Sequence, residues 1–402
     1  MIITRTEQIW LKASENLSRL CHLSKNLYNE GNFLIRREFF NNGKWIHYHS
    51  LYHSIKSSEN YHQLPAQTAQ QVLKLLERNW TSFFRAIKVW GKAKDKFLGK
   101  PKLPHYKPKN GEFMLFFTNQ QVKMKDKVLK FPKKVGLEVE TRLPDITDLR
   151  EVRIIPKGVG YVLEIVYNKK IDPKPLNKNR ILAIDLGVRN LITAVNNNGL
   201  KPFVVKGGVI KSINQNYNKQ KARIQSTYDR QGIKTGKTLQ RLTVKRNKKI
   251  NDYFHKSSKK IVDYCMNNDI GTIVIGYNPE WKQSCRIGKR NNQNFVTIPY
   301  YKLIHQLEYK SEEQGIIVIK QEENYSSKCS FLDDEPIVHH DNYLGRRISR
   351  GLFKSHQDIV INADVNGAYN ILKKALLNAI AADRIKDVGL HPTRWRLATV
   401  TS

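Results

Sequence analysis

The chain has 402 residues, of which 40% are hydrophobic and 10% aromatic, and 70 Lys and Arg against 35 Asp and Glu give it a formal net charge of +35. These values exclude a short basic tail and a disordered polycation, and they indicate about two or three folded domains with a cationic surface. Such a surface attracts polyanions, so nucleic acid is the expected partner ahead of an anionic membrane.

Other classes of protein are disfavoured by what the sequence lacks. It contains no run of about 18 or more apolar residues, and its N-terminal stretch has no apolar signal-peptide core, so we expect a cytoplasmic protein that makes no use of a membrane. The four cysteines, Cys21, Cys265, Cys285 and Cys329, lie far apart without a C-x-x-C pair. We therefore expect free thiols rather than a disulfide framework or a cysteine-built zinc site.

The N-terminal part reads as helical. Apolar residues recur at spacings of three and four from Leu11 to Trp90, and Pro65 suits the first turn of a helix. A connector rich in proline, glycine and lysine follows at residues 98–111. Its candidate nucleic-acid contacts are Lys100, Lys102, Tyr106 and Lys107.

The pattern then changes to short alternating runs between Glu112 and Lys169, which predict a small antiparallel sheet or barrel. The first ten residues read as one further strand of that sheet. Beyond a linker, "ILAIDLGVRNLITAVNNNGLKPFVVKG" resembles a β-meander. A strand over Gly271–Gly276, a helix and a strand ending in "GIIVIK" then form a βαβ unit, which makes the C-terminal half α/β with a mixed sheet.

Residues 211–260 carry fifteen Lys and Arg against two Asp and keep their apolar residues on one helical face. We expect one long helix that docks on the sheet and presents a basic face to phosphates, although a solvated charged face would give the same pattern. The candidate contacts are Lys245, Arg246, Lys248 and Lys249.

Acidic residues stand at the ends of elements. Asp185 ends the strand "LAID", Glu322 and Glu323 end what reads as the buried strand "IIVIK", and Asp364 lies at the start of a predicted helix. Each has a local explanation, as a turn cap, a solvated strand end or a helix N-terminal acid. Together they match a site in which carboxylates bind two Mg²⁺ ions for phosphodiester hydrolysis. Only one of Glu322 and Glu323 can reach such a site, because successive strand residues face opposite sides.

The stretches "AIDLGVRNLITAV" and "NADVNGAYNILKK" resemble the RuvC domain of the TnpB family, RNA-guided endonucleases encoded by bacterial insertion sequences and related to type V CRISPR effectors. "LPAQTAQQVLKLLERNWTSFF" and "FLGKPKLPHYKPK" are similar to its N-terminal regions. The resemblance implies a multidomain α+β protein with an N-terminal wedge-like β-barrel and an inserted helical recognition lobe, followed by an RNase H-like nuclease domain. The implied boundaries are 1–10 and 108–172 for the barrel, 11–107 for the lobe, 173–323 and 362–402 for the RuvC domain and 324–361 for an insertion.

The resemblance also implies the activity and the partners. The family cleaves double-stranded DNA beside a short motif, at a site paired to a guide RNA made from the transposon end. The implied cofactors are two Mg²⁺ ions, replaceable by Mn²⁺, with Asp185 bridging both ions and Glu323 and Asp364 holding one each. A prokaryotic cytoplasm is the implied location.

Two departures from the family pattern stand out. The strand that usually ends in Glu ends here in Gly276, so the protein is either a nuclease-dead DNA-binding repressor or a nuclease whose acid has moved to the neighbouring strand. We favour Glu323 as the moved acid, with Glu322 as second choice and Glu280 as a third candidate. A transposase accessory role without RNA is a further alternative.

The second departure concerns zinc. Where relatives carry a four-cysteine ribbon, this chain offers Cys329 with the adjacent His339 and His340, and we expect a metal-free loop because a tetrahedral ligand set is not visible. Arg346, Arg347 and Arg350 of this loop are candidate nucleic-acid contacts, although a plain surface loop would also account for them.

Overall fold

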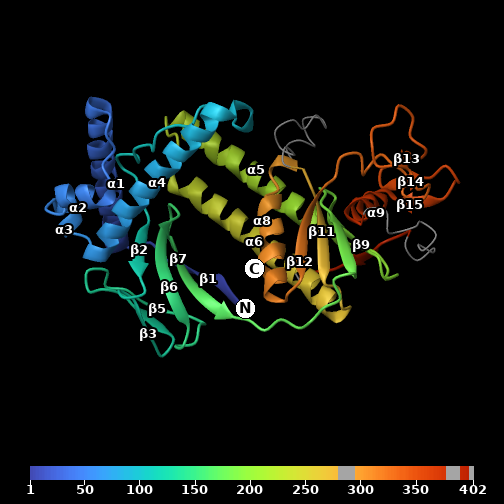
Figure 1. Cartoon of the computed structure of the whole chain (residues 1–402), viewed down its shortest axis with the longest axis horizontal. Coiled ribbons are helices and arrows are strands. Elements are labelled where there is room, and N and C mark those ends of the chain that lie inside the picture. The colour runs from blue at the N-terminus through green and yellow to red at the C-terminus, as the bar shows by residue number, and fades with distance from the viewer. Residues whose placement is uncertain (279–294, 377–389, 398–402) are drawn as a thin grey trace. The chain divides into compact units, whose positions relative to one another are not determined.

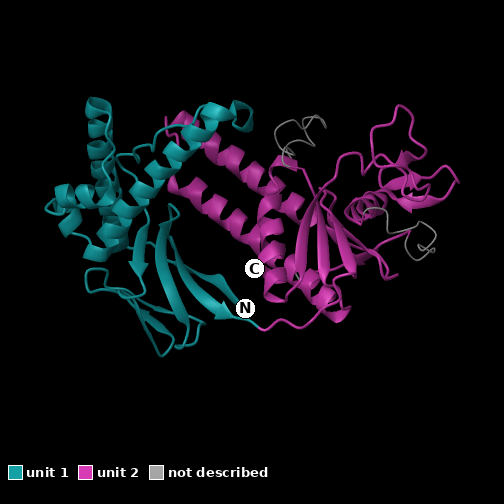
Figure 2. Cartoon of the chain, in the orientation of Figure 1, with its two compact units in different colours: residues 1–171 teal, residues 172–402 magenta. Residues whose placement is uncertain are grey.

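The computed structural model of the chain describes residues 1–278, 295–376 and 390–397. The chain divides into two compact units, residues 1–171 and residues 172–402 (Figure 2). Each unit is described by itself below.

The first unit contains a helical part. Its helices are α1 (Glu15–Asn42), α2 (Tyr48–Ile55), α3 (Glu59–His62) and α4 (Ala66–Lys92), followed by the short 3₁₀ turn η1 (Lys94–Lys96). The Ser14 side chain caps α1 by accepting a hydrogen bond from the Leu17 amide, and Gly43 ends the helix with a φ of 64°. Trp80 of α4 is fully buried and donates its ring N–H to Asn32 Oδ1 at 3.0 Å, so this aromatic residue belongs to the core.

The first unit also contains two antiparallel sheets. One has the order β1 (Ile2–Leu11), β7 (Tyr161–Lys170), β6 (Asp148–Pro156) and β2 (Leu115–Thr118), and the other joins β3 (Lys123–Lys125), β4 (Val128–Lys130) and β5 (Glu138–Glu140). The expected N-terminal strand is present, because β1 pairs with β7 along its whole length, from Ile2 opposite Lys170 to Leu11 opposite Tyr161. A closed barrel stays a prediction.

The second unit is built on a mixed sheet with the order β12, β11, β8, β9, β10, β16 (Figure 1). These strands are β8 (Ile181–Asp185), β9 (Asn190–Asn196), β10 (Phe203–Lys206), β11 (Thr272–Tyr277), β12 (Ile317–Glu322) and β16 (Thr393–Trp395). The first three form the expected antiparallel meander, and β11 runs parallel to both β8 and β12. Helix α8 (Tyr300–Glu313) connects β11 to β12 and completes the expected βαβ unit.

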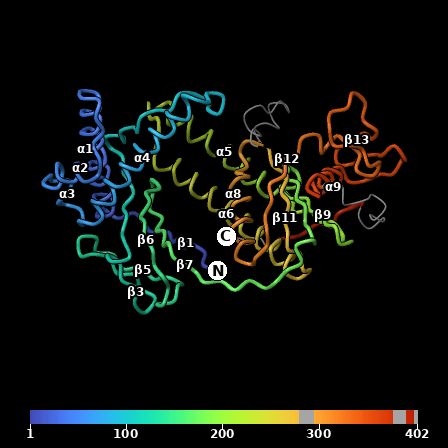
Figure 3. Tube along the Cα trace, in the orientation of Figure 1, coloured from blue at the N-terminus to red at the C-terminus, as the bar shows by residue number. Residues whose placement is uncertain are grey.

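Helices cover both faces of this sheet. Leu182 and Ile184 of β8 pack with Phe254 of α6 (Lys237–Asn267) and with α8. Ile181 and Ala183 point the other way, into a core shared with α9 (Ala363–Ala375). Helix α9 therefore lies against strands that are far from it in the sequence (Figure 3). The strand alternation decides which residues face α9.

Two expectations about this unit are wrong. The basic segment is not one helix, because α5 (Gly208–Arg230) ends before a turn in which Gly232 has a φ of 65°, a conformation that favours glycine, and α6 begins at Lys237. Strand β12 is not buried, since it is an edge strand on which Ile317 is 47% and Ile319 43% exposed. The apolar run made it look like a core strand, and its edge position is a tertiary property.

The packing of α8 on α6 partly buries Lys310, and burial disfavours the charged form of its side chain. Burial lowers the pKa of Lys310 to about 8, while its ammonium donates to His255 O at 2.8 Å and Ser258 Oγ at 2.7 Å. The unfolded chain holds this proton up to about pH 10.4, so the stability of the fold should rise as the pH increases from about 8 to about 10.

Hydrogen exchange measures the free energy needed to open α8. Between pH 7.5 and 9.5 we expect this free energy to rise by ~1 kcal/mol more in the parent chain than in Lys310→Met, after allowance for partial exposure of Lys310. Comparing the two proteins at each pH removes the effect of pH on exchange chemistry. Equal pH dependence in both proteins would contradict the assignment.

Three further strands, β13 (Arg346–Ser349), β14 (Leu352–Lys354) and β15 (Val360–Asn362), form a small antiparallel sheet that leads directly into α9. The preceding loop is fastened to α9 by two asparagines one turn apart. Asn366 accepts from the Phe331 amide at 2.9 Å and donates to Cys329 O at 2.8 Å, and Asn370 donates to Ser326 O at 2.8 Å. The loop that follows β12 is therefore held against the helix that carries Asp364.

Candidate active site

Asp185 is directed toward α9 by its strand. It is the last residue of β8 and shares a strand face with Ile181 and Ala183, both of which pack toward α9. Its Oδ2 lies 3.8 Å from where a Cβ on Gly367 of α9 would stand. The carboxylate therefore sits at the end of the sheet, close to the first turns of that helix.

The two neighbouring glutamates are separated by the alternation of β12. The exposed Glu322 accepts a hydrogen bond from Asn324, and it shares a strand face with Lys320, which forms an ion pair with Glu308 of α8 at 2.7 Å. Glu323 follows on the opposite face and is half-buried. Its carboxylate acts electrostatically on Asp185. The structure thus brings Glu323 to Asp185 and turns Glu322 to the other side.

Asp364 lies in the first turn of α9, after Asn362, whose side chain caps the helix by accepting from the amides of Asp364 and Val365. Its Oδ2 accepts from Asn190 Nδ2 at 2.8 Å, and Asn190 Oδ1 in turn accepts from Lys206 Nζ at 3.0 Å. The capped helix and this relay fix the orientation of the carboxylate.

The electrostatics of the three acids are coupled. Burial, followed by the charges of Glu323 and Asp364, raises the pKa of Asp185 well above its ordinary value, and Arg347 and a hydrogen bond from the Leu186 backbone oppose this rise only in part. Arg347 of β13 also lies 3.8 Å from Asp364 Oδ1. The site therefore concentrates negative charge that nearby cationic side chains balance incompletely.

Gly276 supplies the space that Glu323 occupies. A Cβ at this position of β11 would lie 2.7 Å from Glu323 Oε2 and 2.5 Å from Ile371 Cδ1, both closer than real contacts. Strand β11 has no carboxylate of its own at this end, and the carboxylate of Glu323, the residue after β12, extends over it. The third candidate, Glu280, lies outside the described residues.

The chemistry of the donor set fits a hard divalent cation, since, besides burial, the charges of Glu323 and Asp364 raise the pKa of Asp185, and a cation would relieve that repulsion. Within the residues that the structure describes, no group of three or more His, Cys, Asp or Glu side chains is arranged as a formed metal site. The acids converge without reaching the spacing of bound ligands.

The predicted nucleic-acid contacts occupy different settings. Lys245 and Lys249 of α6 are exposed, whereas the Arg246 guanidinium donates to Asn214 Oδ1 at 2.8 Å and Thr297 O at 2.7 Å. The remaining candidates with exposed side chains are Lys100, Lys102, Tyr106, Lys248, Arg346, Arg347 and Arg350. Lys107 differs from them, because its ammonium packs over the rings of Tyr28 and Phe113 at 4.8 and 4.9 Å and burial lowers its pKa.

The residues considered for zinc are engaged with the protein. Cys329 is buried with its thiol 3.6 Å from Val338 O, and His340 Nε2 lies 2.8 Å from Pro336 O. The His339 ring contacts Tyr325, with 5.7 Å between centroids. Cys21 and Cys265 are likewise buried free thiols, and Cys285 lies outside the described residues.

Sequence reasoning missed the residues that support the acids. Asn190 donates to Asp364 and is itself held by Lys206, and Asn366 and Asn370 fasten the loop after Glu323. Two signals were available in the sequence, namely a polar residue at the start of the apolar run "NLITAV" and a pair of asparagines four residues apart on the apolar face of a helix.

Comparison with known proteins shows which families this chain resembles. A model of the OrfB_IS605 family, described as probable transposases, matches residues 164–282, and a model of the TNB domain of Cas12f1-like proteins matches residues 300–371. A TnpB-like protein of Acidianus two-tailed virus is 26% identical over 406 residues, which cover 90% of this chain and 83% of that protein.

Among solved structures, the protein in a cryo-EM structure of a Cas12f1–sgRNA–target DNA complex is similar with a TM-score of 0.55 and 15% identity, over 89% of this chain and 82% of that one. The chain thus has a mixed α+β fold of the Cas12f type. The two family models and the viral relative together support a TnpB-family protein. No helix in the described part of the chain is long and apolar enough to cross a membrane.

Proposed function

We propose that this protein is an RNA-guided DNA endonuclease of transposon origin that hydrolyses phosphodiester bonds at Asp185, Glu323 and Asp364. The observation that carries the proposal is the convergence of these three acids from two strand ends and a helix start. Besides burial, the charges of Glu323 and Asp364 both raise the pKa of Asp185. The viral relative is TnpB-like, and the related Cas12f1 structure was solved with guide RNA and target DNA.

Each carboxylate has a distinct role in the proposal. Asp185 is the most central acid, because it interacts with both of the others, whereas Asp364 is oriented by Asn190 and Glu323 is seated over Gly276. Divalent cations, Mg²⁺ or Mn²⁺, held by these residues would supply the charge that activates water and stabilises the leaving oxygen. Arg347, close to Asp364, adds positive charge on the side of the insertion.

The parts of the chain receive roles in the same proposal. Residues 1–10 and 108–172 would form the wedge, residues 11–107 the recognition lobe and residues 173–323 with 362–402 the nuclease domain, with residues 324–361 as an insertion that contacts the target. Base pairing with the guide selects the DNA, while basic surfaces supply affinity through phosphates.

The activity test is cleavage by the purified complex. The chain is coexpressed with RNA from the flanking transposon end, purified with that RNA, and given double-stranded DNA that carries the paired site beside a randomised motif. We expect cleavage in Mg²⁺ and none in EDTA, and we expect Asp185→Asn to lower the cleavage rate by about 10³-fold or more while DNA binding persists.

A second candidate function is RNA-guided DNA binding without cleavage. It is favoured by the absence of a carboxylate at Gly276 and of a formed metal cluster among the described residues. Intact DNA that is bound by the complex in Mg²⁺ would select this function, and purification without any RNA would instead indicate an RNA-independent role in transposition.

A further inference from the structure

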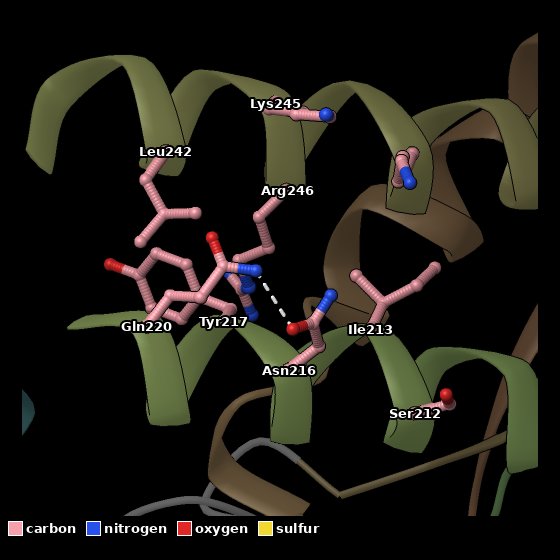
Figure 4. A pocket seen from close by; sticks show the side chains of 9 residues that line it. Ser212, Ile213, Asn216, Tyr217, Gln220, Leu242, Lys245 and Arg246 are labelled. Carbon is pink, nitrogen blue, oxygen red and sulfur yellow. Dashed lines mark hydrogen bonds between the residues drawn. The ribbon is translucent and has the colours of Figure 1, made fainter. Parts of the chain in front are cut away.

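A small cavity lies between the two basic helices of the second unit. It is about 210 Å³ in volume and lies between α5 and the first half of α6 (Figure 4). This is smaller than the roughly 300–1,000 Å³ of sites for drug-sized ligands, so it suits a single small unit of a larger molecule. We call it the α5–α6 pocket. It is separate from the three acids described above.

The two walls of the pocket carry different chemistry. Ser212, Asn216 and Gln220 are spaced by four residues and form one polar stripe along α5. Asn216 Oδ1 accepts from Gln220 Nε2 at 2.8 Å, an interaction that holds the two amides side by side (Figure 4). On the opposite wall, Lys245 and Lys249 are also four residues apart on α6. One wall therefore offers amide and hydroxyl groups, and the other offers ammonium groups.

The floor between these walls is apolar and fixed in place. It is formed by the half-buried side chains of Ile213, Tyr217 and Leu242. The Tyr217 hydroxyl lies 3.1 Å from Thr243 Oγ1, and the Arg246 guanidinium stands 5.4 Å from the centroid of the Tyr217 ring. The hydrogen bonds of Arg246 to Asn214 and Thr297 fix its guanidinium beside the Tyr217 ring, so it supports the floor. A ligand would pay little to order this surface.

The positive charge of the lysines around the pocket favours an anionic ligand. Neither Lys245 nor Lys249 has an ion-pair partner in the described part of the chain, and both are exposed. The nearest acid along α6, Asp252, forms an ion pair with Lys256 at 2.8 Å. The rim thus keeps its positive charge, which attracts phosphate groups.

We propose that the α5–α6 pocket binds one nucleotide of a single-stranded stretch of nucleic acid. The apolar floor contacts the base, the amides of Asn216 and Gln220 hydrogen-bond its edge, and Lys245 and Lys249 bind the adjoining phosphates. A strand that is unpaired at this point is required, since a stacked and paired base exposes neither face nor pairing edge. The inference rests on the proposed function, because its ligand is the guide or the opened target strand.

The test is binding of the full-length chain, freed of RNA, to three single strands of about 12 units in EDTA: RNA, DNA of the same sequence, and an abasic strand with the same phosphates. We expect Asn216→Ala with Gln220→Ala to weaken binding of base-containing strands by about fivefold or more and to leave the abasic strand unaffected. Lys245→Ala with Lys249→Ala should weaken all three strands and reduce the salt dependence of binding.

The matched controls come from the same helix outside the pocket. Gln215→Ala with Asn218→Ala removes the same two residue types, and Lys219→Ala removes one exposed lysine. The inference is overturned if the amide variant binds base-containing strands as the parent does, or if it weakens the abasic strand equally. A difference between RNA and DNA identifies which strand the pocket prefers. Since neither metal nor cleavage enters this assay, its failure is distinguishable from failure of the nuclease proposal.

Discussion

Glu323→Gln should abolish DNA cleavage by the RNA-bound complex and leave DNA binding intact, whereas Glu322→Gln should cleave at the rate of the parent. The two residues are neighbours with equal charge, but only Glu323 lies on the strand face that meets Asp185. Loss of one carboxylate from the acid site should lower the rate by about 10³-fold or more, several kcal/mol in the barrier. Single-turnover cleavage in Mg²⁺ measures this, with DNA binding measured in EDTA.

The neighbouring variant is the control for charge and folding, since Glu322→Gln removes the same charge one residue away. Equal loss of cleavage in both variants would argue for a general effect on the β12 edge. Full activity in both would shift the acid role to another residue, and Glu280→Ala, outside the described residues, is then the next variant to measure.

Gly276→Ala should impair cleavage about 100-fold although it adds only one methyl group far from solvent. Its Cβ would stand 2.7 Å from Glu323 Oε2, so the carboxylate must move, and a displacement of about 1 Å in a catalytic group costs on the order of 10² in rate. The two crowded atoms are the ends of flexible side chains, Glu323 and Ile371, so the fold should accommodate the methyl group. Cleavage rate and thermal unfolding of the same preparation separate the two effects.

Gly208→Ala is a suitable control, because a Cβ at this α5 position meets nothing within 4 Å. It should cleave normally. The double variant Gly276→Glu with Glu323→Gly moves the acid to β11, and it should recover part of the activity that Glu323→Gly alone loses. Normal cleavage by Gly276→Ala, or failure of the transfer with a folded protein, would show that the two positions do not share one carboxylate site.

The elements of the second unit follow from local pattern. Short continuous apolar runs define β8, β9 and β11, and the polar cap Asn362 before an apolar stripe defines the start of α9. Acids at the ends of such elements are visible in the sequence because charged residues are rare in buried runs. The positions of Asp185, Glu323 and Asp364, and the expectation that they meet, therefore required no structure.

What the tertiary structure decided depends on contacts between distant segments. β12 lies at the sheet edge, so an apolar run that looks buried exposes Ile317 and Ile319. The basic segment divides into two helices with a pocket between them, because a glycine turn reverses the chain. The Asn190–Lys206 relay and the seat of Glu323 over Gly276 join residues from different strands.

The sequence by itself thus determined which acids are available and which strands and helices carry them, because strand and helix periods are local properties. Only the tertiary structure decided that Glu323 rather than Glu322 faces Asp185, and that a glycine makes room for it. The direction of Glu323 and the space beside Gly276 depend on strand register and on the packing of α9 against the sheet. These contacts join segments that are far apart in the sequence, such as β8 and α9, and close packing leaves room for only one side chain at each point.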